Sequence, residues 1–139
     1  NNLGAVFRHL GEGQKAISCY EKVIQIQPNH VDAHNNLGTV LKELNEPQKA
    51  ISCYEKAIQI NPNYVNAYNN LGTILGELNH TNEARKNFEK SLSLDPNKKK
   101  TCEGYGNILL KLNQHDKALA YIKKGTGFIK FTQKDFKII

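Results

Sequence analysis

The strongest constraint on the fold of this chain is an internal sequence repeat with a period of about 34 residues. Four columns keep this spacing: Leu3-Gly4, Leu37-Gly38, Leu71-Gly72 and Tyr105-Gly106; Ala16, Ala50, Ala84 and Ala118; Tyr20, Tyr54, Phe88 and Ile122; and Pro28, Pro62 and Pro96. Residues 16–29 and 50–63 agree at 12 of 14 positions. Such a period predicts a stack of similar units, each of which buries its apolar face against its neighbours.

Each unit has the pattern of two helices. In the second unit the apolar residues follow helical spacing in two runs, which are Val31, Leu37, Leu41 and Leu44 and then Ala50, Ile51, Tyr54 and Ile58. Pro47 falls at the start of the second run, where a helix tolerates a missing N–H, and Pro62 falls just beyond its end. The small Gly38 and Ala50 allow the two helices to pack closely, and the ring of Tyr54 fills the remaining space. We therefore expect an all-α fold of antiparallel helix pairs.

These columns resemble the tetratricopeptide repeat, a helix–turn–helix unit whose length equals this period. The resemblance covers residues 1–124 and implies a right-handed superhelical solenoid in which the first helix of each unit lines a concave groove. It divides the chain into a first unit truncated at its N-terminus (1–30), units at 31–64 and 65–98, and a degenerate unit at 99–124. Residues 125–139 break the pattern, and we expect them to form a capping segment or the start of a further domain. Methionine is absent, even at position 1, so we expect the chain to be a piece of a longer protein.

Two glycines follow the fourth unit. We expect Gly125 and Gly127 to end its last helix, and Thr132 with Asp135 has the spacing that caps a short final helix. The apolar residues of this tail are Phe128, Ile129, Phe131, Phe136, Ile138 and Ile139. Because so many apolar side chains need a partner surface, the capping interpretation has them cover the open end of the solenoid.

Paired asparagines mark the helices that the resemblance places in the groove. By register, the candidate peptide contacts are Asn2, Asn35, Asn36, Thr39, Asn66, Asn69, Asn70, Thr73 and Asn107. A side-chain amide offers both donors and an acceptor, so a row of amides can hold the backbone of an extended peptide. Each neutral bond contributes only ~0.5–1.5 kcal/mol net, so binding needs several of them.

The second asparagine of each pair matches the asparagine ladder of the O-linked N-acetylglucosamine transferase superhelix. Residues 57–62 (AIQINP) are also similar to the repeats of that family. Gly104 stands at the ladder position of the fourth unit, so the ladder ends after three units. The alternative is a structural role, in which the amides form hydrogen bonds between neighbouring helices.

A second binding mode of this repeat family, the clamp for a C-terminal carboxylate, does not fit the sequence. A buried carboxylate requires charged donors. The positions that match the clamp are Asn1, Ala5, Asn36, Asn66 and Asn70, which carry no cation.

The sequence shows no pattern of catalytic or metal-binding residues. His30 and His34 have i, i+4 spacing, but no further ligand residue completes a metal set. Cys19, Cys53 and Cys102 form no CxxC pair and, being odd in number, no disulfide framework. There is no phosphate-binding loop and no GxSxG motif. We expect no enzymatic activity, no cofactor and no metal, and the cysteines favour a reducing compartment, the cytoplasm.

The formal net charge of +6 arises in the C-terminal third. Residues 98–139 carry 10 Lys and Arg against 3 Asp and Glu, whereas residues 1–97 carry 9 against 10. Lysines at the end of a repeat array are more often solvated than bound to a polyanion, so we expect no nucleic-acid partner. No apolar run approaches the ~20 residues that span a bilayer, which excludes an integral membrane protein. We expect no membrane partner either.

The sequence therefore predicts a non-catalytic scaffold that binds a peptide or protein segment in its groove. Two alternatives stay open. The chain is a substrate-recruiting arm of a larger, transferase-like enzyme, or a module that self-associates through its open solenoid ends.

Overall fold

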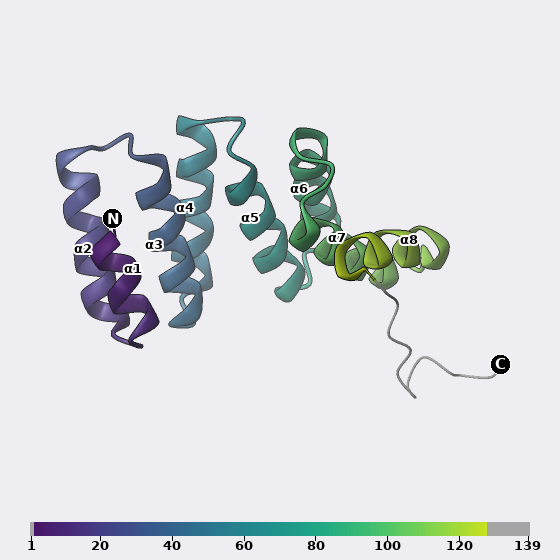
Figure 1. The fold of residues 1–139 in the computed structure, drawn as a ribbon, viewed down its shortest axis with the longest axis horizontal. Coiled ribbons are helices and arrows are strands. Elements are labelled where there is room, and N and C mark those ends of the chain that lie inside the picture. Colours follow the sequence, from purple (N-terminus) through teal and green to yellow (C-terminus); the bar gives the residue numbers. More distant parts are fainter. Residues whose placement is uncertain (1, 128–139) are drawn as a thin grey trace.

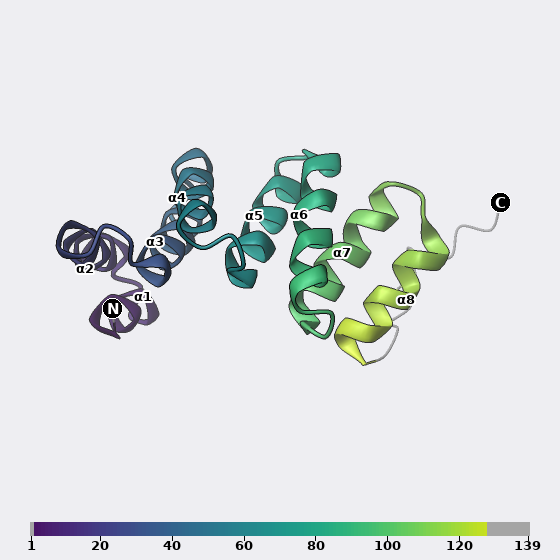
Figure 2. The ribbon, with the colours of Figure 1, turned by 90° about the horizontal axis from the view of Figure 1, so that it is seen from above.

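The computed structural model describes residues 2–127, which form eight helices in four antiparallel pairs and contain no strand (Figure 1). The helices are α1 (Asn2–His9), α2 (Gly13–Ile26), α3 (Val31–Glu43), α4 (Pro47–Ile60), α5 (Val65–Glu77), α6 (Thr81–Leu94), α7 (Lys99–Lys111) and α8 (His115–Thr126). The pairs follow one another in chain order along the long axis of the molecule (Figure 2). The predicted all-α repeat solenoid is confirmed.

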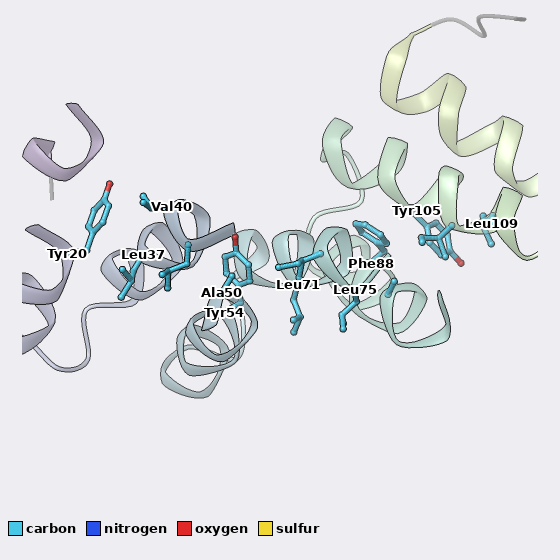
Figure 3. Close-up of a cluster of buried hydrophobic side chains, with 14 of the residues drawn as sticks. Tyr20, Leu37, Val40, Ala50, Tyr54, Leu71, Leu75, Phe88, Tyr105 and Leu109 are labelled. Atoms are coloured by element: carbon cyan, nitrogen blue, oxygen red, sulfur yellow. The ribbon is translucent and has the colours of Figure 1, made fainter. Parts of the chain in front are cut away.

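Close packing within each pair depends on the glycine and aromatic columns. A Cβ added at Gly38 would lie 2.8 Å from Cε1 of Tyr54 and 3.1 Å from the carbonyl oxygen of Ala50. The rings of Tyr20, Tyr54 and Phe88 are at most 2% exposed. Figure 3 shows these rings spaced along the core, one in each of the first three units. The roles predicted for Gly38, Ala50 and Tyr54 are confirmed.

The turn inside each pair uses a residue in the left-handed conformation. Asn45, Asn79 and Asn113 have φ of 61°, 63° and 59°, and Gly11 occupies the same position of the repeat with φ of 74°. Asparagine and glycine are the residues that adopt this conformation at least cost. This column has the same period as the others, yet sequence reasoning missed it.

One column ties the starts of α3, α5 and α7 to the loops before them. Its three bonds are His34 Nε2 to the Pro28 carbonyl (2.8 Å), Tyr68 OH to the Pro62 carbonyl (3.0 Å) and Cys102 Sγ to the Pro96 carbonyl (3.8 Å). Three chemically different side chains therefore serve the same purpose, because each places a polar atom within reach of the carbonyl that follows the preceding helix.

The end of the last helix differs from the prediction. Gly127, with φ of 77°, does terminate α8, but Gly125 lies within the helix. A Cβ at Gly125 would lie 2.8 Å from the backbone nitrogen of Glu103 and 2.8 Å from the carbonyl oxygen of Lys99. Gly125 therefore allows α8 to approach the first turn of α7, and the prediction that it ends the helix is wrong. Thr132 and Asp135 lie outside the described residues.

Candidate functional site

The candidate site is the surface formed by the first helices of the pairs, which we call the groove face. Consecutive helices α3, α5 and α7 are in contact. The face is defined by Arg8, Asn36, Thr39, Lys42, Asn70, Thr73, Asn107 and Lys111. Two hollows open on it, at consecutive junctions between units.

The first hollow, of about 270 Å³, is the polar hollow, lined by Arg8, Thr39, Lys42, Glu43, Tyr54, Asn70 and Thr73. The second, of about 220 Å³, is the apolar hollow, lined by Gly72, Thr73, Gly76, Glu77, Phe88, Gly104, Asn107, Ile108 and Lys111.

Hydrogen bonds join the asparagine pairs of the second and third units into one amide relay, made of Asn35, Asn36, Asn69 and Asn70. Asn70 Nδ2 donates to Asn35 Oδ1 at 2.9 Å and so links α5 to α3. Within each pair the first amide donates to the second at 3.5 Å, a long bond. The relay fixes the orientation of each amide, as expected for a polar network between packed helices.

The two members of each pair differ in burial. Asn35 and Asn69 are 6% and 8% exposed, because they lie between neighbouring units. Asn36 and Asn70 are half-buried, and Thr39 and Thr73 beside them are half-buried too.

The remaining predicted contacts are single exposed amides. They are Asn2 at the start of α1, Asn66 in the first turn of α5, and Asn107 on α7. Asn1 lies outside the described residues. The structure thus brings the asparagine pairs together and leaves these three amides separate from the relay.

A different arrangement replaces the relay at the fourth unit, where Gly104 has no side chain. Thr101 Oγ1 donates to Asn69 Oδ1 at 3.0 Å, and Ser91 Oγ lies 3.1 Å from Thr101 Oγ1. Both hydroxyl residues are fully buried. The second and third units have alanine at the position of Thr101, as Ala33 and Ala67. Sequence reasoning missed this substitution, although the departure from the alanine column could have indicated it.

Charged side chains also join successive units across the groove face. Arg8 pairs with Glu43 at 2.7 Å, and Lys42 pairs with Glu77 at 2.8 Å. The hydrogen bond to Glu43 raises the pKa of Arg8. Lys111 donates to the carbonyl oxygen of Gly76 at 2.8 Å. Such exposed pairs stabilise the fold by only about 0–1 kcal/mol each, and their main effect here is to occupy the charged groups at the edges of the two hollows.

Tyr64 adds a polar contact between the start of α5 and the start of α3. Tyr64 OH donates to Asp32 Oδ1 at 2.5 Å, linking the loop before α5 to α3. Burial, reinforced by this bond, raises the pKa of Tyr64 to about 12. The hydroxyl therefore remains protonated at neutral pH and acts as a donor.

The residues considered for other chemistry have structural roles. His30 Nδ1 accepts a bond from the Ala33 amide at 3.2 Å and caps α3, whereas His34 binds the loop carbonyl described above. Burial raises the pKa of the Cys53 thiol to about 11 and also raises that of Cys102, so neither forms a thiolate at neutral pH. Within residues 2–127 no three His, Cys, Asp or Glu side chains gather into a possible metal site. None of the helices in this range has the length and apolarity to cross a membrane.

Comparisons with solved structures place the fold among known repeat proteins. The crystal structure of MamA matches with a TM-score of 0.80 and 25% identity over 91% of this chain and 74% of that one. MamA from Desulfovibrio magneticus RS-1 shares the fold at a TM-score of 0.78 and 24% identity, over 91% and 71% of the two chains. The first TPR of Spaghetti (RPAP3), bound to the HSP90 peptide SRMEEVD, matches at 0.77 and 26% identity over 81% and 89%.

Sequence comparisons give the family. No curated protein matches the chain. Three family models, each described as a tetratricopeptide repeat, match residues 1–63, 53–86 and 100–128, and together they cover most of the chain. The period, the helix pairs and these matches agree, and the chain belongs to the tetratricopeptide repeat family of protein-interaction modules.

Proposed function

We propose that this chain is a non-catalytic scaffold that binds an extended peptide or protein segment along the groove face through an asparagine ladder. Asn70 carries the proposal. Its amide donates to Asn35 and accepts from Asn69, which uses two of the four bonds that an amide can form. One N–H and one lone pair remain for a ligand, on a side chain whose orientation is already fixed. That combination suits the N–H and C=O groups of a peptide backbone.

Several further groups extend the row of contacts. Asn36 occupies the equivalent position one unit earlier, and Asn2 the position before that. The Thr39 and Thr73 hydroxyls each donate to a carbonyl of their own helix, so their oxygens are left as acceptors, and that of Thr39 already accepts a 3.4 Å bond from Tyr54 OH. Asn66 and Asn107 lie exposed at the edges. The resemblance of the repeats to those of the O-linked N-acetylglucosamine transferase superhelix supports the same backbone-binding mode, and the reduced cysteines are in keeping with a cytoplasmic location.

The likeness to a repeat domain bound to an HSP90 peptide supports a peptide as the class of ligand. A carboxylate-gripping mode suits this chain less well. Asn66 and Asn70 stand where the clamp requires cations, and Lys42 and Arg8 are occupied by Glu77 and Glu43. We therefore favour recognition of the backbone over recognition of a chain terminus. The same groove suits a substrate-recruiting arm of a larger enzyme equally well.

Self-association is the second candidate, supported by the open face of the first unit. Leu3 and Val6 are 59% and 51% exposed, whereas the equivalent Leu37 and Val40 are 8% and 1% exposed. The second-unit pair is covered by the unit before it. Size-exclusion chromatography with light scattering over a range of protein concentrations tests this candidate, which predicts a dimer that dissociates on dilution and in the Val6→Asp variant.

The ladder is tested by separating its structural role from ligand contact. Asn70→Ala alone would leave the buried Asn35 oxygen without its donor and so destabilise the fold. The fourth unit shows how to replace that donor, because the Thr101 hydroxyl donates to Asn69, which is the equivalent of Asn35 one unit later. The double variant Ala67→Thr/Asn70→Ala keeps a donor for Asn35 and removes the ligand-facing amide. Ala67→Thr alone is the matched control.

The probe is a dodecamer selected on the wild-type chain from a random peptide library, with binding measured by isothermal titration calorimetry. We expect the double variant to bind at least about fivefold more weakly than the Ala67→Thr control, since one or two neutral hydrogen bonds are lost. Equal affinity of the two, with unchanged helicity, would refute the ladder.

A further inference from the structure

We propose that the apolar hollow between α5, α6 and α7 is a subsite for one bulky, uncharged apolar side chain of the bound segment. This inference rests on the proposed function and adds which kind of side chain the groove selects in the bound segment. In this arrangement the asparagines of the second and third units bind the backbone of the peptide, and the junction of the third and fourth units binds one of its side chains.

The two hollows of the groove face are equivalent sites at consecutive junctions. Thr39, Glu43 and Tyr54 of the polar hollow correspond to Thr73, Glu77 and Phe88 of the apolar one, each a single repeat later in the sequence. A direct comparison of the two therefore shows what this chain has changed at one position of its groove.

Three polar groups of the polar hollow have no polar counterpart in the apolar hollow, and each belongs to a different column of the repeat. Lys42 becomes Gly76, the hydroxyl of Tyr54 is absent from Phe88, and Asn70 becomes Gly104. Together with Ile108 these changes give a floor and walls of glycine, phenylalanine and isoleucine. Three columns therefore converge on one surface and make it more apolar than the equivalent surface one junction earlier.

Packing alone does not require the change to Gly76, whereas a Cβ at Gly104 would lie 2.7 Å from Cζ of the Phe88 ring. A Cβ at Gly76 would lie 2.8 Å from Cδ1 of Ile108, a flexible side-chain end. The equivalent pair one unit earlier is Lys42 with Ile74, and there the long side chain and the isoleucine coexist. The third unit could therefore have kept its lysine.

Two charged side chains stand at the edge of the hollow, and each has a partner within the fold. The Glu77 carboxylate pairs with Lys42 at 2.8 Å, and the Lys111 ammonium donates to the Gly76 carbonyl at 2.8 Å. The Glu77 charge is neutralised by Lys42, and the charge of Lys111 stays at the rim, where its acceptor is a neutral carbonyl. The floor formed by Phe88, Ile108 and the glycines carries no charge and is complementary to an uncharged apolar side chain. Its volume of about 220 Å³ is below the ~300–1,000 Å³ of sites for drug-sized molecules, which suits a single side chain.

The test introduces at the apolar hollow an ion pair of the kind that Lys42 forms with Glu77 one unit earlier. Gly76→Lys with Lys111→Glu places the Lys42–Glu77 type of ion pair across the mouth of the hollow and changes the net charge by −1. Lys117→Gln, an exposed residue of α8 outside the lining, is the control with the same change of charge. Phe88→Tyr is a milder second variant, which returns only the hydroxyl of the column to the floor.

The probe is the dodecamer selected from a random library on the wild-type chain, compared with the same peptide in which its enriched apolar residue is replaced by alanine. We expect that replacement to weaken binding at least about tenfold in the wild type and in Lys117→Gln, since burial of a large apolar side chain is lost. In the double variant the loss should fall below about twofold, and in Phe88→Tyr it should be intermediate.

Two results would overturn the inference while leaving the proposed function intact. One is a set of selected peptides with no enriched apolar position. The other is an equal loss on alanine replacement in the wild type and the double variant. A wild-type chain that enriches no peptide at all would instead refute the proposed function, and the inference with it.

Discussion

The buried hydroxyl of Thr101 is expected to be one of the more important single groups for the stability of this solenoid. We predict that Thr101→Val, which preserves the shape of the side chain and removes only the hydroxyl, destabilises the fold. Thr101 is fully buried and donates to Asn69, which is itself 8% exposed. Water therefore cannot readily replace the donor that the variant removes.

The expected cost follows from the bonds that are lost. Asn69 Oδ1 loses its 3.0 Å bond, and Ser91 retains only a 3.4 Å bond to the Val65 carbonyl. An unsatisfied buried acceptor costs ~1–3 kcal/mol, and we expect Thr101→Val to fall in this range. For a domain of ordinary stability, ~5–15 kcal/mol, that is a large fraction.

Urea unfolding followed by circular dichroism measures this cost, with Thr73→Val as the matched control. The Thr73 hydroxyl bonds only to the Asn69 carbonyl of its own helix, so its removal should change the free energy of unfolding by less than about 0.5 kcal/mol. In an Asn69→Ala background, Thr101→Val should cost at least about 1 kcal/mol less than in the wild type. A Thr101→Val variant within about 0.5 kcal/mol of the wild type would show that the buried network is not what holds this junction.

Two further predictions concern the helix pairs and the tyrosines. Gly38→Ala should lower the free energy of unfolding in urea by ~1–3 kcal/mol, because its Cβ would lie 2.8 Å from the Tyr54 ring. Gly11→Asn should be neutral, because Gly11 has open space around it and asparagine stands at the equivalent positions. A Gly38→Ala variant as stable as the wild type would contradict the packing account. Burial and carboxylate partners raise the pKa of Tyr64 and Tyr105 to about 12 from 10.0, so the folded state holds these protons more tightly. Stability from this source is complete below pH 10 and is lost as the pH rises towards 12, and the urea midpoint should fall less steeply over that interval in Tyr64→Phe/Tyr105→Phe.

The repeat period was sufficient to predict the fold. Because Gly38, Ala50 and Tyr54 each belong to a column that recurs once per repeat, sequence alone indicated two helices in close contact and the ring between them. Pro47 and Pro62 set the helix boundaries for local reasons, and both lie where expected. Features that repeat, or that depend only on neighbours along the chain, can be read without knowing the three-dimensional packing.

The candidate site was less predictable, because its details depend on contacts between units. Sequence reasoning treated both members of each asparagine pair as contacts for a ligand. The structure buries Asn35 and Asn69 under the following unit and leaves Asn36 and Asn70 nearer the surface. Whether any of the four contacts a ligand stays a prediction.

Non-repeating residues were the other source of difficulty. The local preference of glycine predicts that Gly125 breaks the helix, whereas the structure has it within α8, where the missing Cβ allows close approach to α7. A residue that departs from its column contacts a residue distant in sequence, and that contact can be identified only in the folded chain.

The central claim is that a peptide binds the groove face, and NMR chemical-shift mapping with the library-selected dodecamer tests it most directly. We predict that the side-chain amide resonances of Asn36 and Asn70 shift on addition of the peptide, together with backbone amides of α3, α5 and α7. Resonances of the second helices α2, α4 and α6 should change little except near Tyr54 and Phe88, which line the two hollows. Shifts confined to those second helices, with the Asn36 and Asn70 amides unmoved, would contradict the account.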